Sequence, residues 1–342
     1  MSKGPANGGQ PRNPRMIDVA RLAGVSHQTV SRVLNESNVV GPELRERVTN
    51  AIQLLGYKRN TSARALATNR TMNLGVVCFG IEQYGPSLAL IGMSESARQA
   101  GYATSLVSLP EINRDSVREA LEHLVDIAVD GIAVIAPVKG ATDAVMGLSA
   151  NIPLVAFEPG AGHGASSVAI DEVQGARLAT RHLLDLGHKT VWHVSGPDGW
   201  LATDARILGW RAELAAQGRV AHCVVKGDWS SASGYRAGQI IVGNRDITAV
   251  YVANDQMALG VLQALHEAGL AVPRDISIVG FDDIPESPYF QPALTTVRLD
   301  FKAIGHLSVA RLLKMVRGEE LPPSPMLQPE LIVRASAAAP SR

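Results

Sequence analysis

One short run near the N-terminus, SHQTVSRVLN, carries side chains suited to reading a nucleic acid. His27 and Gln28 stand at the start of an expected helix, and Arg32 follows about one turn later. A Gln side chain can form two hydrogen bonds with adenine, and an Arg side chain can do the same with guanine. The free amides at such a helix start can face a phosphate. We therefore expect this helix to enter the major groove of double-stranded DNA.

Short polar side chains surround these three residues. They are better suited to phosphate than to base edges, because a single short group distinguishes bases poorly. The expected phosphate contacts are Ser26, Thr29, Ser31 and Asn35. The alternative is that all of these residues only solvate the outer face of a helix.

The charge distribution favours the nucleic-acid interpretation. Residues 1–70 contain eleven Lys and Arg against four Asp and Glu, whereas the whole chain has a formal net charge of zero. A short basic piece in front of a mildly acidic body is expected when one end contacts a polyanion. A solvated basic tail is the alternative.

The elements that would carry these residues are three short helices. Apolar spacing predicts a first helix with Ile17, Val19, Ala20 and Ala23 on one face. Gly24 supplies the turn, and Ser26 caps a second helix that buries Val30, Val33 and Leu34. A third helix starts at Pro42, ends at Gly56, and places Leu44, Val48, Ala51, Ile52 and Leu55 inward. This is a helix-turn-helix pattern.

From residue 72 onward, short apolar runs alternate with helical patterns, which is typical of parallel sheets covered by helices. Two consecutive series indicate two similar lobes with a ligand in the cleft at the carboxyl ends of their strands. The first series is expected at 74–79, 104–108, 131–136 and 153–157, and the second at 190–195, 221–225, 248–253 and 276–281.

Neither a catalytic nor a cofactor motif is present. The chain has no phosphate-binding P-loop, no HExxH zinc motif, no GxSxG nucleophile elbow and no dinucleotide fingerprint. We expect neither an enzyme nor a cofactor. Its two cysteines, Cys78 and Cys223, lie in apolar stretches, as buried thiols of a reducing cytosol do. No apolar run is long enough to span a bilayer, and residues 1–14 read as a disordered lead-in. We expect a cytoplasmic protein.

Five stretches carry a resemblance to a known family. From residue 16 to about 334 the chain resembles the bacterial lac repressor family of regulators, through SHQTVSRVLN, GDWSSASGY, VANDQMALG, DISIVGFDD and LTTVRLDF. The resemblance implies an N-terminal all-α helix-turn-helix domain, a hinge helix, and a two-lobed α/β core with parallel sheets, related to periplasmic binding proteins.

The resemblance also implies domain boundaries. The helix-turn-helix domain covers 15–58, the hinge 59–71 and the core 72–334, with a flexible tail at 335–342. The chain would pass between the lobes near residues 170, 299 and 329. The N-terminal lobe would then hold 72–170 and 300–329, and the C-terminal lobe 171–299.

Position by position, His27, Gln28 and Arg32 match base-reading positions of the family. In the hinge, Leu66 matches a leucine that inserts into the minor groove, and Asn60 matches the asparagine that opens the hinge helix. We also expect Arg64 to contact DNA. Arg59 stands where many members carry proline.

In the core, Arg206, Trp229, Asn254 and Asp282 match sugar-contact positions, and Glu158 replaces a shorter aspartate. Their chemistry fits, because these polar groups can pair with vicinal hydroxyls and an indole face can stack on a pyranose. Three of these residues also have a purely structural interpretation. Trp229 can be a core residue, Asn254 a helix cap and Asp282 a turn residue.

Three positions depart from the lac-type pocket of the family. Ile135, Ile170 and Leu299 stand where the lac-type pocket has Asn, Phe and Gln. A galactoside-like effector, another glycoside and a disaccharide all fit this pattern.

The resemblance implies a sequence-specific repressor of carbohydrate-utilisation genes. It would bind a palindromic operator as a homodimer and be released by a sugar; we expect a dimer because no leucine heptad follows Arg334. The alternatives are a regulator that needs a purine or another co-repressor, a soluble sugar-binding receptor, and a sugar-modifying enzyme using Glu158 and Asp282.

Overall fold

The structure is a computed structural model. It describes residues 14–34, 40–57, 70–111, 113–135, 138, 152–159, 167–222, 224–324 and 326–341. The chain divides into two compact units, Met1–Thr71 and Met72–Arg342. Several expected features lie outside the described residues: most of the lead-in, the hinge residues 59–69, and Asn35, Asn60, Arg64, Leu66 and Cys223.

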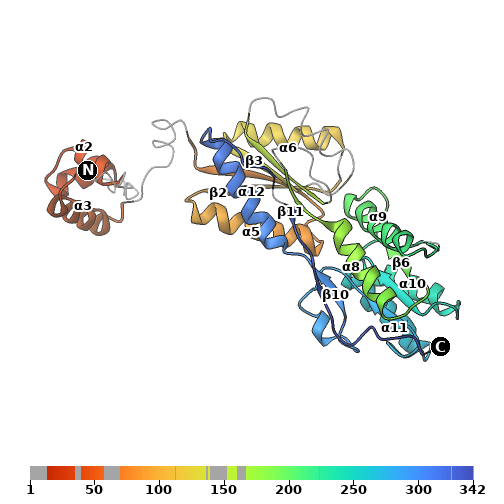
Figure 1. Ribbon diagram of the computed structural model, residues 1–342. Helices are drawn as coiled ribbons and strands as arrows, with labels where there is room; N and C mark the ends of the chain where they lie inside the picture. The colour runs from red at the N-terminus through yellow and green to blue at the C-terminus, as the bar shows by residue number, and fades with distance from the viewer. Residues whose placement is uncertain are drawn as a thin grey trace, which may run out of the picture. The chain divides into compact units, whose positions relative to one another are not determined.

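The first unit contains the three expected helices, α1 (Met16–Ala23), α2 (His27–Leu34) and α3 (Pro42–Leu55) (Figure 1). Gly24 has φ +63°, a left-handed conformation that glycine adopts without steric cost, and it turns the chain between α1 and α2. The Ser26 hydroxyl accepts a hydrogen bond from the Thr29 amide at 3.0 Å and so caps α2. The helix-turn-helix prediction is confirmed.

The small core of this unit differs in part from the expected one. Val19, Val30 and Val48 are fully buried, but Ile17 is 55% exposed and Leu44 is 38% exposed. Both exposed residues lie in the first turns of their helices. The apolar spacing assigns them to the inner face, yet the closely packed part of that face starts further along each helix.

The second unit begins with a six-stranded sheet of order β11-β5-β4-β3-β1-β2, in which every pair is parallel. It contains the four strands expected for the first series. Its strands are β1 (Asn73–Phe79), β2 (Ala103–Leu109), β3 (Gly131–Ile135), β4 (Leu154–Pro159), β5 (Ser167–Ile170) and β11 (Met326–Leu327). Helix α6 (Arg114–Asp126) covers one face, and α5 (Tyr84–Gln99) and α12 (Phe301–Val316) cover the other.

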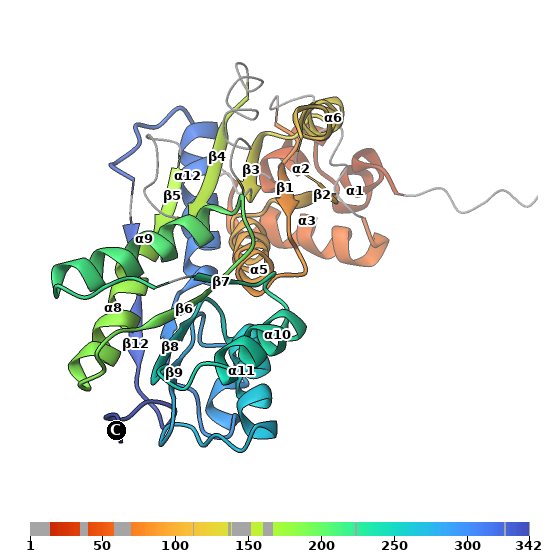
Figure 2. The ribbon, with the colours of Figure 1, turned by 90° about the vertical axis from the view of Figure 1, so that its right-hand side faces the viewer.

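A four-stranded parallel sheet of order β7-β6-β8-β9 forms the second lobe. Its strands are β6 (Trp192–Ser195), β7 (Val224–Lys226), β8 (Ala249–Val252) and β9 (Ser277–Val279), which confirms the second series. Figure 2 shows α8 (Glu172–Asp185) and α9 (Leu201–Ala216) on one face, with α10 (Ser231–Val242) and α11 (Asp255–Glu267) on the other.

The chain passes between the two lobes three times. It leaves the first sheet after β5 and enters α8, returns from β10 (Thr296–Arg298) into α12, and leaves again between β11 and β12 (Glu330–Ile332). Strands β10 and β12 pair antiparallel and so tie two of the crossings together. A 3-10 turn, η1 (Ser287–Tyr289), precedes β10.

The prediction of a flexible tail at 335–342 is wrong for residues 335–341, the part of the tail that the structure describes. Ser336 is fully buried, and its carbonyl accepts a hydrogen bond from the Ile278 amide at 2.8 Å. Its hydroxyl accepts from the Thr295 amide at 2.8 Å and donates to the Ile278 carbonyl at 2.6 Å. The run ASAAAP consists of small residues without a periodic apolar pattern, but its backbone can pair with the free edge of β9.

Replacing Ser336 with alanine tests this docking. The change leaves the buried Thr295 amide without its acceptor and the Ile278 carbonyl without its hydroxyl donor, so we expect the free energy of unfolding to fall by about 1–3 kcal/mol. Urea denaturation measures the effect. Ser341→Ala, which removes an exposed hydroxyl from the same tail, is the matched control. Equal stability of the two variants would contradict the docking.

Candidate functional site

The outer face of α2 presents the residues expected to read DNA. His27, Gln28 and Arg32 are exposed, while Val30 and Val33 are buried against the other helices of the unit. Ser26 is exposed, and Thr29 and Ser31 are half-buried. The helix therefore offers a polar face held on a small apolar core, which is the arrangement needed for insertion into a groove.

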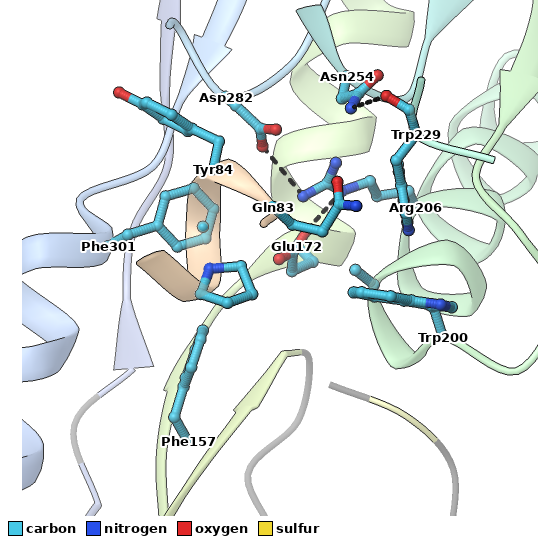
Figure 3. Close-up of a pocket in the computed structure, with 13 residues that line it drawn as sticks. Gln83, Tyr84, Phe157, Glu172, Trp200, Arg206, Trp229, Asn254, Asp282 and Phe301 are labelled. Atoms are coloured by element: carbon cyan, nitrogen blue, oxygen red, sulfur yellow. Dashed lines mark hydrogen bonds and ion pairs between the residues drawn. The ribbon is translucent and has the colours of Figure 1, made fainter. Parts of the chain in front are cut away.

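A cavity with about 470 Å³ of open space lies between the two lobes of the second unit. Both sheets direct the carboxyl ends of their strands at it, so loops after β1, β7, β8 and β9 supply part of its wall (Figure 3). Its lining residues are Gln83, Tyr84, Gly85, Pro86, Phe157, Glu172, Trp200, Ala202, Arg206, Trp229, Asn254, Asp282 and Phe301.

Arg206 connects the polar groups of this cavity. Its Nε donates to a Glu172 oxygen at 2.6 Å, its Nη2 donates to Asp282 Oδ1 at 3.2 Å, and its Nη1 donates to the Ala253 carbonyl. The guanidinium also lies 4.0 Å from the centre of the Phe281 ring. Arg206 lies within α9 and reaches the strand ends through its long side chain.

Burial and neighbouring charges shift the pKa values of Arg206 and Asp282 in opposite directions. Burial lowers the pKa of Arg206, but the negative charges of Glu172 and Asp282 raise it by a larger amount. The guanidinium therefore stays charged. Burial raises the pKa of Asp282 to about 8, although Arg206 partly opposes that rise. Glu172 and Asp282 thus share one cation, and burial brings the pKa of Asp282 close to neutral pH.

Trp229 and Asp282 both have left-handed backbones, with φ +73° and φ +101°. Such angles are strained for side chains other than glycine and persist where neighbouring contacts fix them. Asn254 Nδ2 donates to the Trp229 carbonyl at 3.1 Å, and the Asp282 amide donates to the Val297 carbonyl at 2.7 Å. These contacts hold the two residues in place at the cavity wall.

Asn254 combines a structural role with a place in the cavity. Its side-chain oxygen accepts from the Met257 amide at 2.9 Å and caps α11, as the structural alternative predicted. The adjacent Asp255 is fully buried and accepts from the Ser287 and Thr296 hydroxyls at 2.6 and 2.7 Å. Burial raises the pKa of Asp255 to about 6, and these two hydrogen bonds limit the rise. Asp255 thereby fixes the loop that carries Asp282.

Four of the five expected ligand residues meet in the cavity: Arg206, Trp229, Asn254 and Asp282. Glu158 lies in β4, and its side chain is outside the described part of the structure. The three departures from the lac-type pattern do not line the cavity. Ile135, Ile170 and Leu299 are instead buried in the main hydrophobic core.

Sequence reasoning missed the aromatic and N-terminal-lobe part of the wall. Gln83, Tyr84, Phe157 and Phe301 reach the cavity from the first lobe, while Trp200 reaches it from the loop before α9. A usable signal was available for two of them. Gln83 lies in the segment that follows β1, at the strand end where ligands bind, and Trp200 lies in the segment that follows β6.

The structure offers no candidate metal centre within the described segments, where no group of three or more His, Cys, Asp and Glu is suitably placed. Burial raises the pKa of Cys78 to about 12, which keeps its sulfur protonated and unreactive. Among the described helices, none combines the length and the apolar character required to cross a membrane.

The raised pKa of Asp282 predicts a pH effect on stability. Its folded pKa of about 8 lies above the usual unfolded value of about 3.9, so the unfolded chain loses this proton first as pH rises. The contribution of Asp282 to the free energy of unfolding therefore decreases as the pH rises from about 4 to about 8. In Asp282→Asn this loss should disappear, giving a flatter pH profile by urea denaturation. Asp246→Asn is the exposed control, and parallel profiles for wild type and Asp282→Asn would contradict the effect.

Comparison with known proteins agrees with this geometry. Residues 15–60 match the model of the bacterial regulatory proteins of the lacI family, and residues 180–337 match that of a periplasmic binding protein-like domain. The chain is 32% identical to the lactose operon repressor of Escherichia coli (strain K12) over 328 residues, covering 95% of this chain and 91% of the repressor. It is 35% identical to the regulator GalS of Salmonella typhimurium over 308 residues, covering 85% and 86% of the two chains.

A solved structure extends the agreement to three dimensions. The lac repressor dimer bound to operator and the anti-inducer ONPF matches with a TM-score of 0.86 and 31% identity, covering 96% of this chain and 100% of that chain. The two family models, the relatives and the solved structure therefore all indicate the same protein family. The chain belongs to the lacI family of bacterial regulatory proteins.

Proposed function

We propose that this DNA-binding transcriptional regulator is a repressor of carbohydrate-utilisation genes that a glycoside releases from its operator. The observation that carries the proposal is the buried Arg206 between two carboxylates, beside Trp229, in a cavity that both lobes line. Polar groups that are already ordered and an indole ring suit a polyhydroxylated ring better than a fatty or purely aromatic ligand. The relatives are regulators rather than enzymes, and we propose binding without turnover.

For DNA recognition we assign base contacts to His27, Gln28 and Arg32. Their exposure on α2 supports this assignment, as does the major-groove geometry of a helix-turn-helix. Ser26, Thr29, Ser31 and Asn35 are proposed to contact phosphates. Asn60, Arg64 and Leu66 of the hinge are proposed to contact the minor groove between two copies of the chain, because a palindromic operator requires a symmetric dimer.

For effector recognition we assign hydroxyl contacts to Arg206, Asp282 and Asn254, stacking to Trp229, and a further polar contact to Glu158. Asn254 retains one amide hydrogen beyond its bond to the Trp229 carbonyl, so it can both position Trp229 and meet a ligand. The ion pair to Arg206 uses Oδ1 of Asp282, which keeps Oδ2 for a ligand hydroxyl.

Release from DNA would result from a change in the angle between the two lobes. Because residues of both lobes line the cavity, a bound ligand makes different contacts when the lobes change their angle. The three crossings are the segments that would absorb such a motion. An effector that binds more tightly to the lobe angle of the DNA-free protein lowers operator affinity. The factor is the ratio of the effector's affinities for the DNA-free and the DNA-bound lobe angles.

A regulator that needs a co-repressor, such as a purine, is the second candidate. The same cavity and the same lobe motion would serve it, with the opposite sign. The aromatic residues Trp200 and Trp229 could stack on a purine base, so the sign of the ligand effect and the ligand class must both be measured.

The base-reading role of α2 predicts the effect of Gln28→Ala. The operator is first selected from random duplexes with the wild-type protein. Loss of a paired contact to one base should then weaken operator binding roughly tenfold or more and relax selectivity at one position in each half-site. Gln53→Ala, an exposed glutamine on α3, is the control. If the two variants bind the operator alike, Gln28 does not read a base.

The effector proposal is tested by fluorescence anisotropy on the selected operator, with glucosides, galactosides, disaccharides and purines added in turn. We expect a glycoside to release wild-type protein and to have little effect on Asp282→Ala, which still binds DNA. A ligand at a hundred times its dissociation constant adds about 2.7 kcal/mol to the native state, so thermal unfolding gives a second readout. Stronger operator binding with a purine alone would establish the second candidate instead.

A further inference from the structure

The turn between α1 and α2 is tied to α3 by the side chain of Arg47. This exposed residue donates from Nη2 to the Ala23 carbonyl at 2.7 Å and to the Gly24 carbonyl at 3.4 Å. The side-chain hydrogen bond between Ser26 and Thr29 joins residues three apart, whereas Arg47 reaches back across 24 residues to Ala23. Arg47 therefore fixes the turn to a helix that is distant from it in the sequence.

The two accepting carbonyls lie at a helix end that needs hydrogen-bond donors. The last four carbonyls of a helix have no partner within that helix. In α1, the amides of Gly24 and Val25 donate to two of these carbonyls, and Arg47 donates to that of Ala23. The guanidinium also brings a positive charge to the negative end of the helix dipole, which is favourable. Arg47 thus completes the cap of α1 from another helix.

The same turn sets the position of the proposed base-reading residues. Helix α2 begins at His27, three residues after Gly24, and Gln28 follows. The buried residues of α2 are Val30 and Val33, whose short side chains give the helix a small anchor in the core. A shift of the turn would therefore tilt α2. Because hydrogen bonds weaken steeply as their angles change, a tilt would weaken a paired contact to a base.

From this geometry we infer that Arg47 is a positioning residue for sequence recognition, which holds the orientation of α2 through the turn without reading a base itself. The inference rests on the base contacts proposed for α2 and adds a residue outside that helix. The alternative role for an exposed arginine in this unit is a phosphate contact. Loss of a phosphate contact weakens binding to all sequences alike and lowers the salt dependence by about one charge. Loss of a positioning residue lowers the selectivity instead.

Operator binding by the full-length protein tests the inference through Arg47→Met, which removes the guanidinium and keeps an unbranched stem. Fluorescence anisotropy gives the affinities for the selected operator and for a random duplex over a range of salt concentrations. We expect the ratio of the two affinities to fall at least about fivefold, because a misplaced paired base contact costs a factor of this order.

Arg21→Met is the matched control, since it removes one positive charge from an exposed arginine of the same unit. We expect this variant to keep the wild-type affinity ratio and to show the same salt dependence as Arg47→Met. The ratio also separates position from stability. If Arg47→Met only unfolded part of the unit, its affinity for both duplexes would fall by the same factor and the ratio would not change. Circular dichroism checks the helix content of each variant.

A double-mutant cycle with Gln28→Ala shows whether Arg47 acts through α2. If Arg47 orients Gln28, Arg47→Met should cost clearly less operator affinity in the Gln28→Ala background than in the wild-type protein. Losses that multiply would show that Arg47 contacts DNA independently and would overturn the inference.

Two further results would also overturn the role of Arg47 and leave the base contacts of α2 intact. One is an unchanged affinity ratio in Arg47→Met, and the other is a salt dependence lower by about one charge than that of Arg21→Met. If Gln28→Ala itself keeps the wild-type selectivity, the proposed base contacts fail, and the inference fails with them. The Gln28→Ala variant alone therefore distinguishes the two failures.

Discussion

The buried pairing of Arg206 with Glu172 and Asp282 is the constraint on which the second unit depends. Removing these charges from water carries a large desolvation cost, so the guanidinium must meet both carboxylates in good geometry. The pairing links the first residue of α8, the middle of α9 and the loop after β9. A small displacement of any of these segments would leave a charge unpaired, which makes their relative position well defined.

The location of this cluster connects binding to lobe movement. Glu172 begins α8 directly after the first crossing, and Asp282 precedes β10, which leads into the second crossing. Arg298 and Arg334 pair with Asp283, beside Asp282, so the strand pair at the crossings is held by charge as well. A ligand that alters the surroundings of Asp282 therefore acts next to the segments about which the lobes would turn.

Local patterns in the sequence were sufficient for the elements but not for their long-range contacts. Alternating apolar runs predicted eight strands in two parallel series, and apolar spacing with Gly24 and Pro42 predicted three helices at the N-terminus. Arg206 was identified through its resemblance to a family position, yet its partner Glu172 lies 34 residues away and has no local signal. The same holds for Phe157 and Trp200, which meet at the cavity only after both lobes have formed. Burial depends on which element packs against each face, and spacing alone therefore misplaced Ile17 and Leu44 in the core.

The three crossings also determine when the lobes can fold during synthesis. The sheet of the first lobe is completed by β11 (Met326–Leu327) and covered by α12, which follow all four sheet strands of the second lobe in the chain. Residues 72–170 alone would therefore expose the edge of β5 and the sheet face under α12, with the apolar surface of Phe157 and Ile170. The second lobe, by contrast, has all four of its sheet strands by residue 279. All strands of the C-terminal sheet are therefore available for pairing before the N-terminal sheet, which precedes it in the sequence, has its last strand.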